Sequence, residues 1–163
     1  MIRELTAADA DELAALYAGN RDFLEPFEPE RGDAWFTAAG QRERLAQPLT
    51  GWRFAILDGD AIAGTISVSD VVRGAFHSAH VGYWVDATRN GRGLATQAVA
   101  DVVEFAFGRG RLHRLQAATL VDNDASQRVL EKNGFERIGL ARRYLHIGGD
   151  WRDHILFQRI ANA

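Results

Sequence analysis

The chain has 163 residues, of which 47% are hydrophobic and 25% are charged, and its formal net charge at pH 7 is −3. These values are ordinary for a soluble globular protein with a sizeable core, and they lack the basic excess that is usual for nucleic-acid binders. The sequence contains no cysteine, which excludes disulfides, thiolate metal ligands and a covalent acyl-cysteine intermediate.

The first fifty residues predict a short strand followed by helices. Residues 2–5 indicate the strand, and the spacing of Thr6 and Asp9 resembles a capping box that begins a helix over residues 7–18. Residues 20–31 contain two prolines and indicate a short helix that enters a loop. Residues 33–46 again favour a helix.

From residue 51 the hydrophobic period changes to two, which indicates strands. Residues 52–57 and 61–68 flank an Asp-Gly-Asp turn and predict a β-hairpin. Residues 78–85 predict the next strand.

The second half of the chain alternates helices and strands. Residues 94–107 predict a helix with a wide apolar face, and residues 112–121 predict a strand. Residues 123–132 predict a second helix, ended by the left-handed cap Asn133-Gly134. Three further strands are predicted, and the last two are joined by a Gly-Gly-Asp turn: residues 135–140, 144–147 and 151–157.

No linker or shift in composition divides the sequence, so residues 1–163 are predicted to form a single α/β domain of the α+β type. No segment indicates a signal peptide, and no apolar run reaches the length of roughly 20 residues that spans a bilayer.

The segment between residues 85 and 96 carries the most informative functional signal. It leads from a strand through Gly91 and Gly93 into the N-terminus of a helix. Such a terminus leaves about four unpaired backbone amides, and glycine lets a phosphate approach the backbone closely. We predict a phosphate or pyrophosphate site with charge added by arginines at its rim, formed by Arg89, Asn90, Gly91, Arg92, Gly93, Leu94, Ala95 and Thr96. The alternative is a glycine turn that only begins a helix.

Other cofactor motifs do not fit the sequence. A dinucleotide fingerprint requires a third glycine where the chain has Thr96, and the P-loop pattern G-x-x-x-x-G-K-[ST] does not occur. No two histidines lie at i and i+4 on a predicted helix, so no metal site is predicted.

A third pattern fits. Residues Asn90–Ala95 resemble the Q/R-x-x-G-x-G/A coenzyme A signature of the GNAT N-acetyltransferase superfamily, from which Asn90 departs at the first position. Residues 123–126 and 131–135 resemble that superfamily's N-x-x-A/S and E-K-x-G-F segment. The order of the predicted elements is also similar.

Longer segments resemble the RimJ/RimL branch, whose members acetylate the N-terminal amine of ribosomal proteins: residues 20–29, 73–76, 82–84 and 144–154. The resemblance implies a mixed, curved central β-sheet flanked by helices. It also implies that acetyl-CoA enters a cleft where the strands at residues 78–85 and 112–121 splay apart.

The resemblance implies roles for individual residues. A backbone amide of Trp84 or Val85 would donate to the thioester oxygen, and Asn123 would bond the pantetheine arm. Many relatives use a tyrosine on the leaving thiolate, but the matching position is Leu130, which has no donor. We therefore predict Ser126 as the thiolate partner; the alternative is that it only caps the helix.

Two side chains are candidates for the catalytic base. His80 lies on the strand that leads to the cofactor, where relatives often have a glutamate, and histidine is the residue type that titrates near neutral pH. Glu28 lies in a Pro-Phe-Glu-Pro loop similar to the branch's and is predicted to hold the substrate ammonium. The alternatives are a core-edge histidine and a solvated acid. The other histidines are predicted to be structural: His77, His113, His146 and His154.

The predicted reaction is direct acetyl transfer in a ternary complex, with the N-terminal α-amine of a protein as the main acceptor. An α-amine, with a pKa of about 7.7–8.0, needs little help from a base. The alternatives are a small-molecule amine acceptor and a non-catalytic acyl-CoA-binding module. We expect a cytoplasmic monomer or homodimer, with no nucleic-acid or membrane partner.

Overall fold

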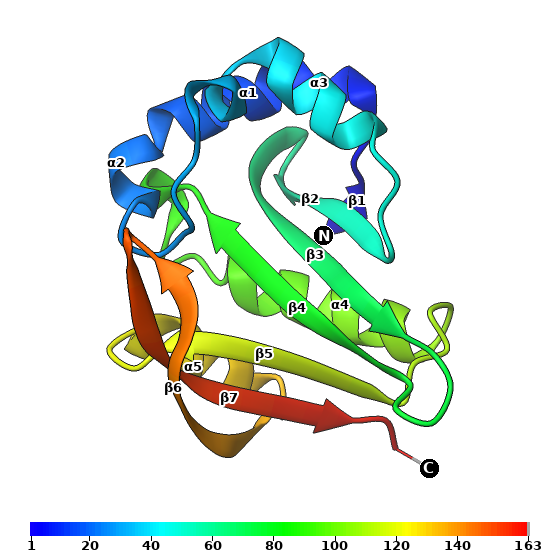
Figure 1. Cartoon of the computed structure of the whole chain (residues 1–163). Helices are drawn as coiled ribbons and strands as arrows, with labels where there is room; N and C mark the ends of the chain where they lie inside the picture. Colours follow the sequence, from blue (N-terminus) through cyan, green and yellow to red (C-terminus); the bar gives the residue numbers. More distant parts are fainter. Residues whose placement is uncertain (163) are drawn as a thin grey trace.

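The segments with period-two hydrophobicity become strands of one sheet in the computed structural model, which describes residues 1–162. Within that part of the chain the sheet has seven strands in the order β1-β2-β3-β4-β5-β7-β6 (Figure 1). The strands are β1 (Ile2–Glu4), β2 (Trp52–Asp58), β3 (Ala61–Val72), β4 (Ser78–Val85), β5 (Arg114–Leu120), β6 (Glu136–Ile147) and β7 (Asp150–Ile160). Neighbouring strands are antiparallel except β4 and β5, which are parallel, so the predicted mixed sheet is confirmed.

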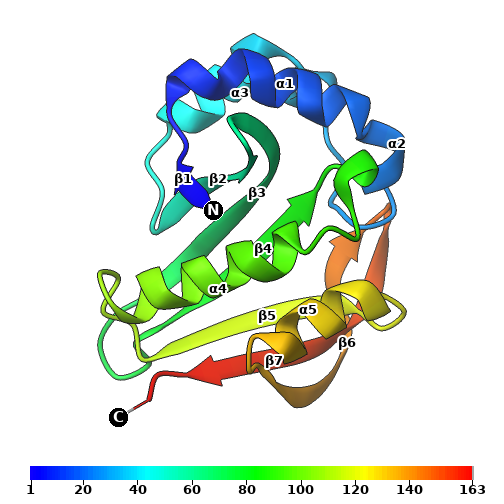
Figure 2. The same cartoon turned by 180° about the vertical axis from the view of Figure 1, so that it is seen from behind.

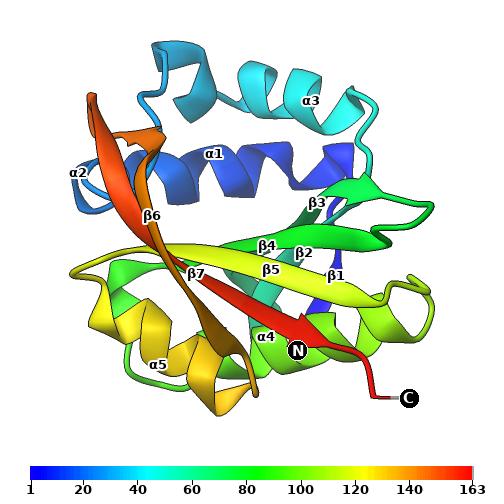
Figure 3. The ribbon, with the colours of Figure 1, turned by 60° about the horizontal axis from the view of Figure 1, so that its bottom comes forward.

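Helices cover both faces of the curved sheet. One face carries α1 (Ala10–Gly19) and α3 (Ala38–Ala46), with the single-turn α2 (Arg21–Leu24) beside them (Figure 3). The other face carries α4 (Leu94–Phe107) and α5 (Asp124–Lys132) (Figure 2). The apolar stripe of α4 is buried as predicted, with Ala98, Val99, Val102 and Ala106 fully inaccessible.

Two predicted helices and two predicted strands differ most from the structure. The helix predicted over residues 7–18 begins with a 3-10 turn at Ala7–Asp9, and the helix predicted over residues 33–46 is split into a 3-10 turn at Asp33–Phe36 and α3. The split follows from Thr37, which is extended and whose hydroxyl accepts a hydrogen bond from the Gly40 amide as the N-cap of α3. The strands predicted at residues 135–140 and 144–147 are one strand, β6, whose register shifts between Ala141 and Leu145.

The pairing of β4 with β5 is short. It covers only Ser78 to His80 on β4 and Arg114 to Gln116 on β5, although both strands continue beyond these residues. The two strands therefore diverge toward their C-terminal ends, as predicted for the cofactor cleft. Beyond the paired residues, the backbone N–H and C=O groups by which β4 and β5 face each other have no partner on the opposite strand. These groups are therefore available to bind other molecules.

We expect Leu115→Ala to destabilise the fold strongly. Leu115 lies on the central strand β5, and none of its surface is exposed. Removing a fully buried leucine side chain costs about 2–5 kcal/mol in the free energy of unfolding. Leu140→Ala is the matched control, because Leu140 is 57% exposed on β6. Urea denaturation of both variants measures the difference, and equal midpoints would contradict the assigned core.

Candidate active site

A cavity of about 360 Å³ lies where β4 and β5 diverge. Its walls include Gly82–Trp84 on β4, Ala117–Leu120 on β5 and the start of α5 with Asn123 and Ser126. Residues from α1, from the loop after α2 and from α3 complete it on the other side of the sheet. The cavity thus joins the two faces of the molecule at the point where the sheet opens.

The glycine loop has the backbone geometry that an anion cradle requires. Gly91 and Gly93 have φ values of 77° and 79°, and a Cβ on either would meet no atom of the described chain within 4 Å. Gly93 is the N-cap of α4, and its carbonyl accepts a hydrogen bond of 3.0 Å from the Gln97 amide. The amides of the first three residues of α4 therefore have no partner within the helix.

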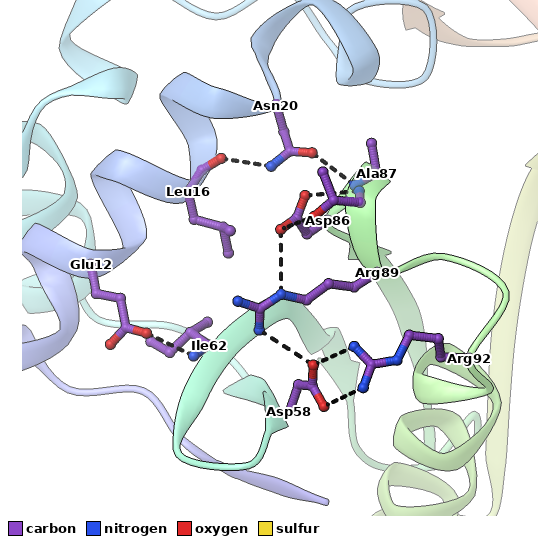
Figure 4. Close-up of polar contacts among 10 residues, drawn as sticks. Glu12, Leu16, Asn20, Asp58, Ile62, Asp86, Ala87, Arg89 and Arg92 are labelled. Atoms are coloured by element: carbon purple, nitrogen blue, oxygen red, sulfur yellow. Dashed lines mark hydrogen bonds and ion pairs between the residues drawn. The ribbon is translucent and has the colours of Figure 1, made fainter.

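Arg89 and Arg92 are both paired with one carboxylate. Arg92 donates to Asp58 at the end of β2 through two nitrogens, at 2.6 and 3.0 Å, and Nη1 of Arg89 lies 3.7 Å from the same side chain (Figure 4). Nε of Arg89 also lies 3.5 Å from Asp86. The charge at the rim is therefore largely balanced, and the contribution of these two arginines to phosphate binding stays a prediction.

The loop is also anchored to α1. The side chain of Asn20, just after α1, donates to the Leu16 carbonyl and accepts from the Ala87 amide, at 2.9 Å in each case (Figure 4). Asn20 is buried. This contact fixes the segment between β4 and α4 against a helix on the opposite face of the sheet.

Ser126 lines the cavity, and its hydroxyl is hydrogen-bonded to a residue that was not predicted from the sequence to act in the site. Its Oγ lies 2.9 Å from the hydroxyl of Tyr83 on β4, which also donates to the Ser126 carbonyl at 3.1 Å. Burial raises the pKa of Tyr83 to about 12, so the phenol keeps its proton at neutral pH. Tyr83 therefore brings to this site, from β4, the phenolic hydroxyl that Leu130 lacks; Leu130 is fully buried in the core.

The cap of α5 is made by Asn123, whose side-chain oxygen accepts from the Ser126 amide at 3.1 Å. The Ser126 hydroxyl takes no part in that hydrogen bond. The two residues thus divide the roles that the sequence left open: Asn123 caps the helix, and the Ser126 hydroxyl belongs to the pair with Tyr83.

The backbone of β4 favours one of the two amides predicted to bind the thioester oxygen. The Asp86 amide donates to the carbonyl of Ala63 on β3, at 2.7 Å. Because backbone groups alternate in direction along an extended strand, the Trp84 amide also faces β3, whereas the Val85 amide faces the cleft. Trp84 contributes its side chain instead: its indole nitrogen donates to the Tyr17 hydroxyl at 3.2 Å, and the two rings are 4.9 Å apart.

The two candidate bases lie in different places. Glu28 lines the cavity, and burial raises the pKa of its carboxyl despite the opposing effect of Arg31. His80 is not among the residues that line the cavity; its Nδ1 lies 3.8 Å from the exposed Asp70. His154, predicted to be structural, is buried in the cavity wall with Nδ1 2.9 Å from the Arg152 carbonyl.

Comparison with known proteins decides the family. Residues 1–136 match the family model described as the acetyltransferase (GNAT) domain. The chain belongs to the GNAT acetyltransferase family. Membership confirms the predicted enzyme class, N-acetyltransferase, and acetyl-CoA as the acetyl donor.

Individual GNAT relatives are similar over nearly the whole chain. The chain is 39% identical over 161 residues to the probable N-acetyltransferase YjcK of Bacillus subtilis, covering 94% of this chain and 89% of that protein. It is 34% identical over 164 residues to the [ribosomal protein uS5]-alanine N-acetyltransferase of Escherichia coli, covering 96% and 84%. The resemblance to the RimJ/RimL branch is thereby confirmed.

Solved GNAT structures confirm the fold. The ribosomal-protein-S5-alanine acetyltransferase from Vibrio fischeri superposes with a TM-score of 0.93 at 37% identity, over 98% of this chain and 91% of that one. RimJ of Mycobacterium smegmatis, solved in complex with CoA-disulfide, superposes with a TM-score of 0.88 at 31% identity, over 98% and 81%.

Two further properties concern the described residues 1–162. No helix among them is both long and apolar enough to cross a bilayer. They also contain no cluster of three or more histidine or acidic side chains that could hold a metal ion.

Proposed function

We propose that this GNAT enzyme acetylates the N-terminal α-amine of a protein by direct attack of the amine in a ternary complex. The observation that carries the proposal is the cavity between β4 and β5, because Glu28 and the hydrogen-bonded hydroxyls of Ser126 and Tyr83 are among the residues that line it. The names of the similar proteins, which include uS5-alanine acetyltransferases, support a ribosomal-type protein acceptor.

The residues around the cleft fit coenzyme A. The open backbone at Gly91 and Gly93 and the free amides at the start of α4 suit a diphosphate, which helix N-termini bind well. Asn123 lies at the cavity wall, where its amide nitrogen would bond the pantetheine arm. When bound, acetyl-CoA supplies the acetyl group as a thioester.

We assign a separate role in acetyl transfer to each of several groups of the chain. The Val85 amide is the donor for the carbonyl oxygen on which negative charge develops. As the bond from the amine nitrogen to the acetyl carbon forms and the bond from that carbon to sulfur breaks, Glu28 would accept the proton that the amine loses, and the Ser126 hydroxyl would give its proton to the sulfur. The Tyr83 phenol would turn from the Ser126 carbonyl to give its proton to Ser126 Oγ, and the phenolate would regain a proton from solvent. Positioning of the two reactants supplies most of the rate, because an α-amine is already partly neutral near pH 7.5.

A turnover screen tests the acceptor. The full chain is mixed with acetyl-CoA and released thiol is measured with peptides that begin with a free alanine or serine. Matched peptides with a blocked α-amine and a free lysine side chain, and a panel of small amines, serve as comparisons. We expect turnover only with the free α-amine peptides; turnover confined to small amines would contradict the proposal.

Glu28→Gln should change the shape of the pH profile. Glu28 works only as a carboxylate, and burial raises its pKa, so its activity is lost as pH falls through that raised value. In the wild type, log kcat/KM should fall with slope one below the pKa of the amine and with slope two below that of Glu28. Glu28→Gln should keep slope one throughout, at a lower rate. The exposed neighbour Glu25→Gln is the control, and two identical profiles for wild type and Glu28→Gln would exclude Glu28 as the base.

A further inference from the structure

The acceptor side of the cavity is cationic. Among the described residues that line it, Arg31, Arg44 and Arg53 are opposed by a single carboxylate, that of Glu28. The chain as a whole has a net charge of −3, so this concentration of arginine is local. A cationic wall repels an ammonium group, which makes it an unexpected lining for a site that binds only an amine.

The phosphates of coenzyme A do not account for this charge. Arg44 lies on α3, which covers one face of the sheet, whereas the glycine loop leads into α4 on the opposite face (Figure 3). Arg53 lies on β2, and its Nη1 donates to the Arg44 carbonyl at 2.8 Å. The arginines therefore belong to the acceptor half of the cavity.

Arg44 is held in place but is not neutralised. Its Nε donates to the Gln41 side chain at 2.9 Å, and its guanidinium carbon lies 4.7 Å from the centre of the Trp35 indole ring. Its buried Nη2 has no hydrogen-bond partner in residues 1–162. Burial lowers the pKa of the guanidinium, and nearby Arg53 and Arg31 lower it further, whereas Tyr17 and Glu28 act in the opposite direction.

Arg31 and Trp35 also stack on each other and carry buried N–H groups without hydrogen-bond partners in residues 1–162. The Arg31 guanidinium lies 3.9 Å from the centre of the Trp35 ring, and its Nε is 3.7 Å from Glu28, too far for a hydrogen bond. Neither Arg31 Nε nor the Trp35 indole nitrogen, both buried, has a hydrogen-bond partner in the part of the chain that the structure describes. Three residues that line one cavity thus each carry an unmatched N–H donor.

Positive charge that is not compensated in a partly buried site is costly, and a bound carboxylate relieves that cost. Arginine forks bind carboxylates through paired, charge-assisted hydrogen bonds. We propose that Arg31, Trp35, Arg44 and Arg53 form an anion-binding subsite that receives the carboxylate of an aspartate or glutamate within the first few residues of the acceptor peptide. This inference rests on the proposed function, since it specifies which protein N-termini the enzyme acetylates.

Peptide selectivity tests the subsite. The full-length protein is assayed with acetyl-CoA and peptides that begin with alanine and carry Asp or Glu at position 2, 3 or 4, each compared with its Asn or Gln counterpart. At one of these positions, kcat/KM should favour the acidic peptide by at least about tenfold, as expected for a hydrogen bond to a charged group. Arg44→Gln should reduce that ratio to near one by slowing only the acidic peptide.

The control is Arg42→Gln on the same helix, because Arg42 is exposed and faces Asp11 at 3.4 Å. It should keep the wild-type ratio. If Arg44→Gln does not fold, Arg31→Gln in the preceding loop is measured in the same way. A purely structural role for Arg44 would slow both peptides alike, and that result would overturn the subsite.

Different experimental results would contradict the proposed subsite and the proposed acceptor class. Equal kcat/KM for acidic and amide peptides in the wild type, with both turned over, would overturn the subsite and leave the α-amine acceptor intact. Turnover of free L-aspartate or L-glutamate but of no peptide would overturn the protein acceptor, and with it the inference as stated.

Discussion

Gly93→Asp is expected to abolish measurable binding of coenzyme A. Gly93 precedes the free amides of α4, and its φ of 79° directs an added side chain into open space at the loop. A side chain at this positive φ is strained, but aspartate is among the few non-glycine residues that adopt the left-handed conformation, so the helix should still form. Its carboxylate would accept the amides that otherwise bind the diphosphate and would repel the phosphates.

Isothermal titration calorimetry with coenzyme A measures the effect, and we expect the Kd to rise by at least about 100-fold, a loss of two charge-assisted hydrogen bonds or more. Gly74→Asp is a matched control: Gly74 has a φ of 75°, is open to solvent and lies in the turn between β3 and β4. The affinity of the Gly74→Asp variant for coenzyme A should equal that of the wild type. An unchanged Kd in Gly93→Asp would refute the backbone cradle.

Ser126→Ala and Tyr83→Phe should each lower kcat by about 10²-fold while changing KM little, since general acid catalysis by a positioned group contributes 10²–10⁴-fold. Both variants remove a hydroxyl and leave the backbone unchanged. The α5 cap survives Ser126→Ala, because Asn123 accepts from the Ser126 amide and not from its hydroxyl. Steady-state kinetics with the peptide acceptor, together with thermal melts, separate chemistry from folding.

The double variant distinguishes a relay from two independent groups. Because the two hydroxyls lie 2.9 Å apart, they should act as one unit, and the loss in kcat for the double variant should be far less than the product of the single losses. Fully multiplicative losses would show that the residues act separately. A raised KM with unchanged kcat in Ser126→Ala would reduce its role to substrate binding.

Sequence alone predicted much of the secondary structure, through the spacing of residues that are close together in the chain. The glycine loop, the hairpin of β2 and β3, the bounds of β4 and α4 and the cap at Gly134 all follow from residues a few positions apart, because turns, caps and amphipathic faces depend on neighbouring backbone and side chains. The motifs built on this local chemistry sufficed to identify the GNAT family. They also made Ser126 a candidate thiolate partner, and that role stays a prediction.

Only the tertiary structure decided which distant residues meet. Tyr83 reaches Ser126 across 43 positions of sequence, and Arg92 reaches Asp58 across 34. The order of strands in the sheet brings α3, β2 and the loop after α2 to one wall of the cavity, where the carboxylate of Glu28 alone opposes Arg44, Arg53 and Arg31. Sequence periodicity places a side chain on one face of its own helix or strand. Long-range packing determines which residues lie opposite that side chain, and these neighbours set its burial, the charges around it and its pKa.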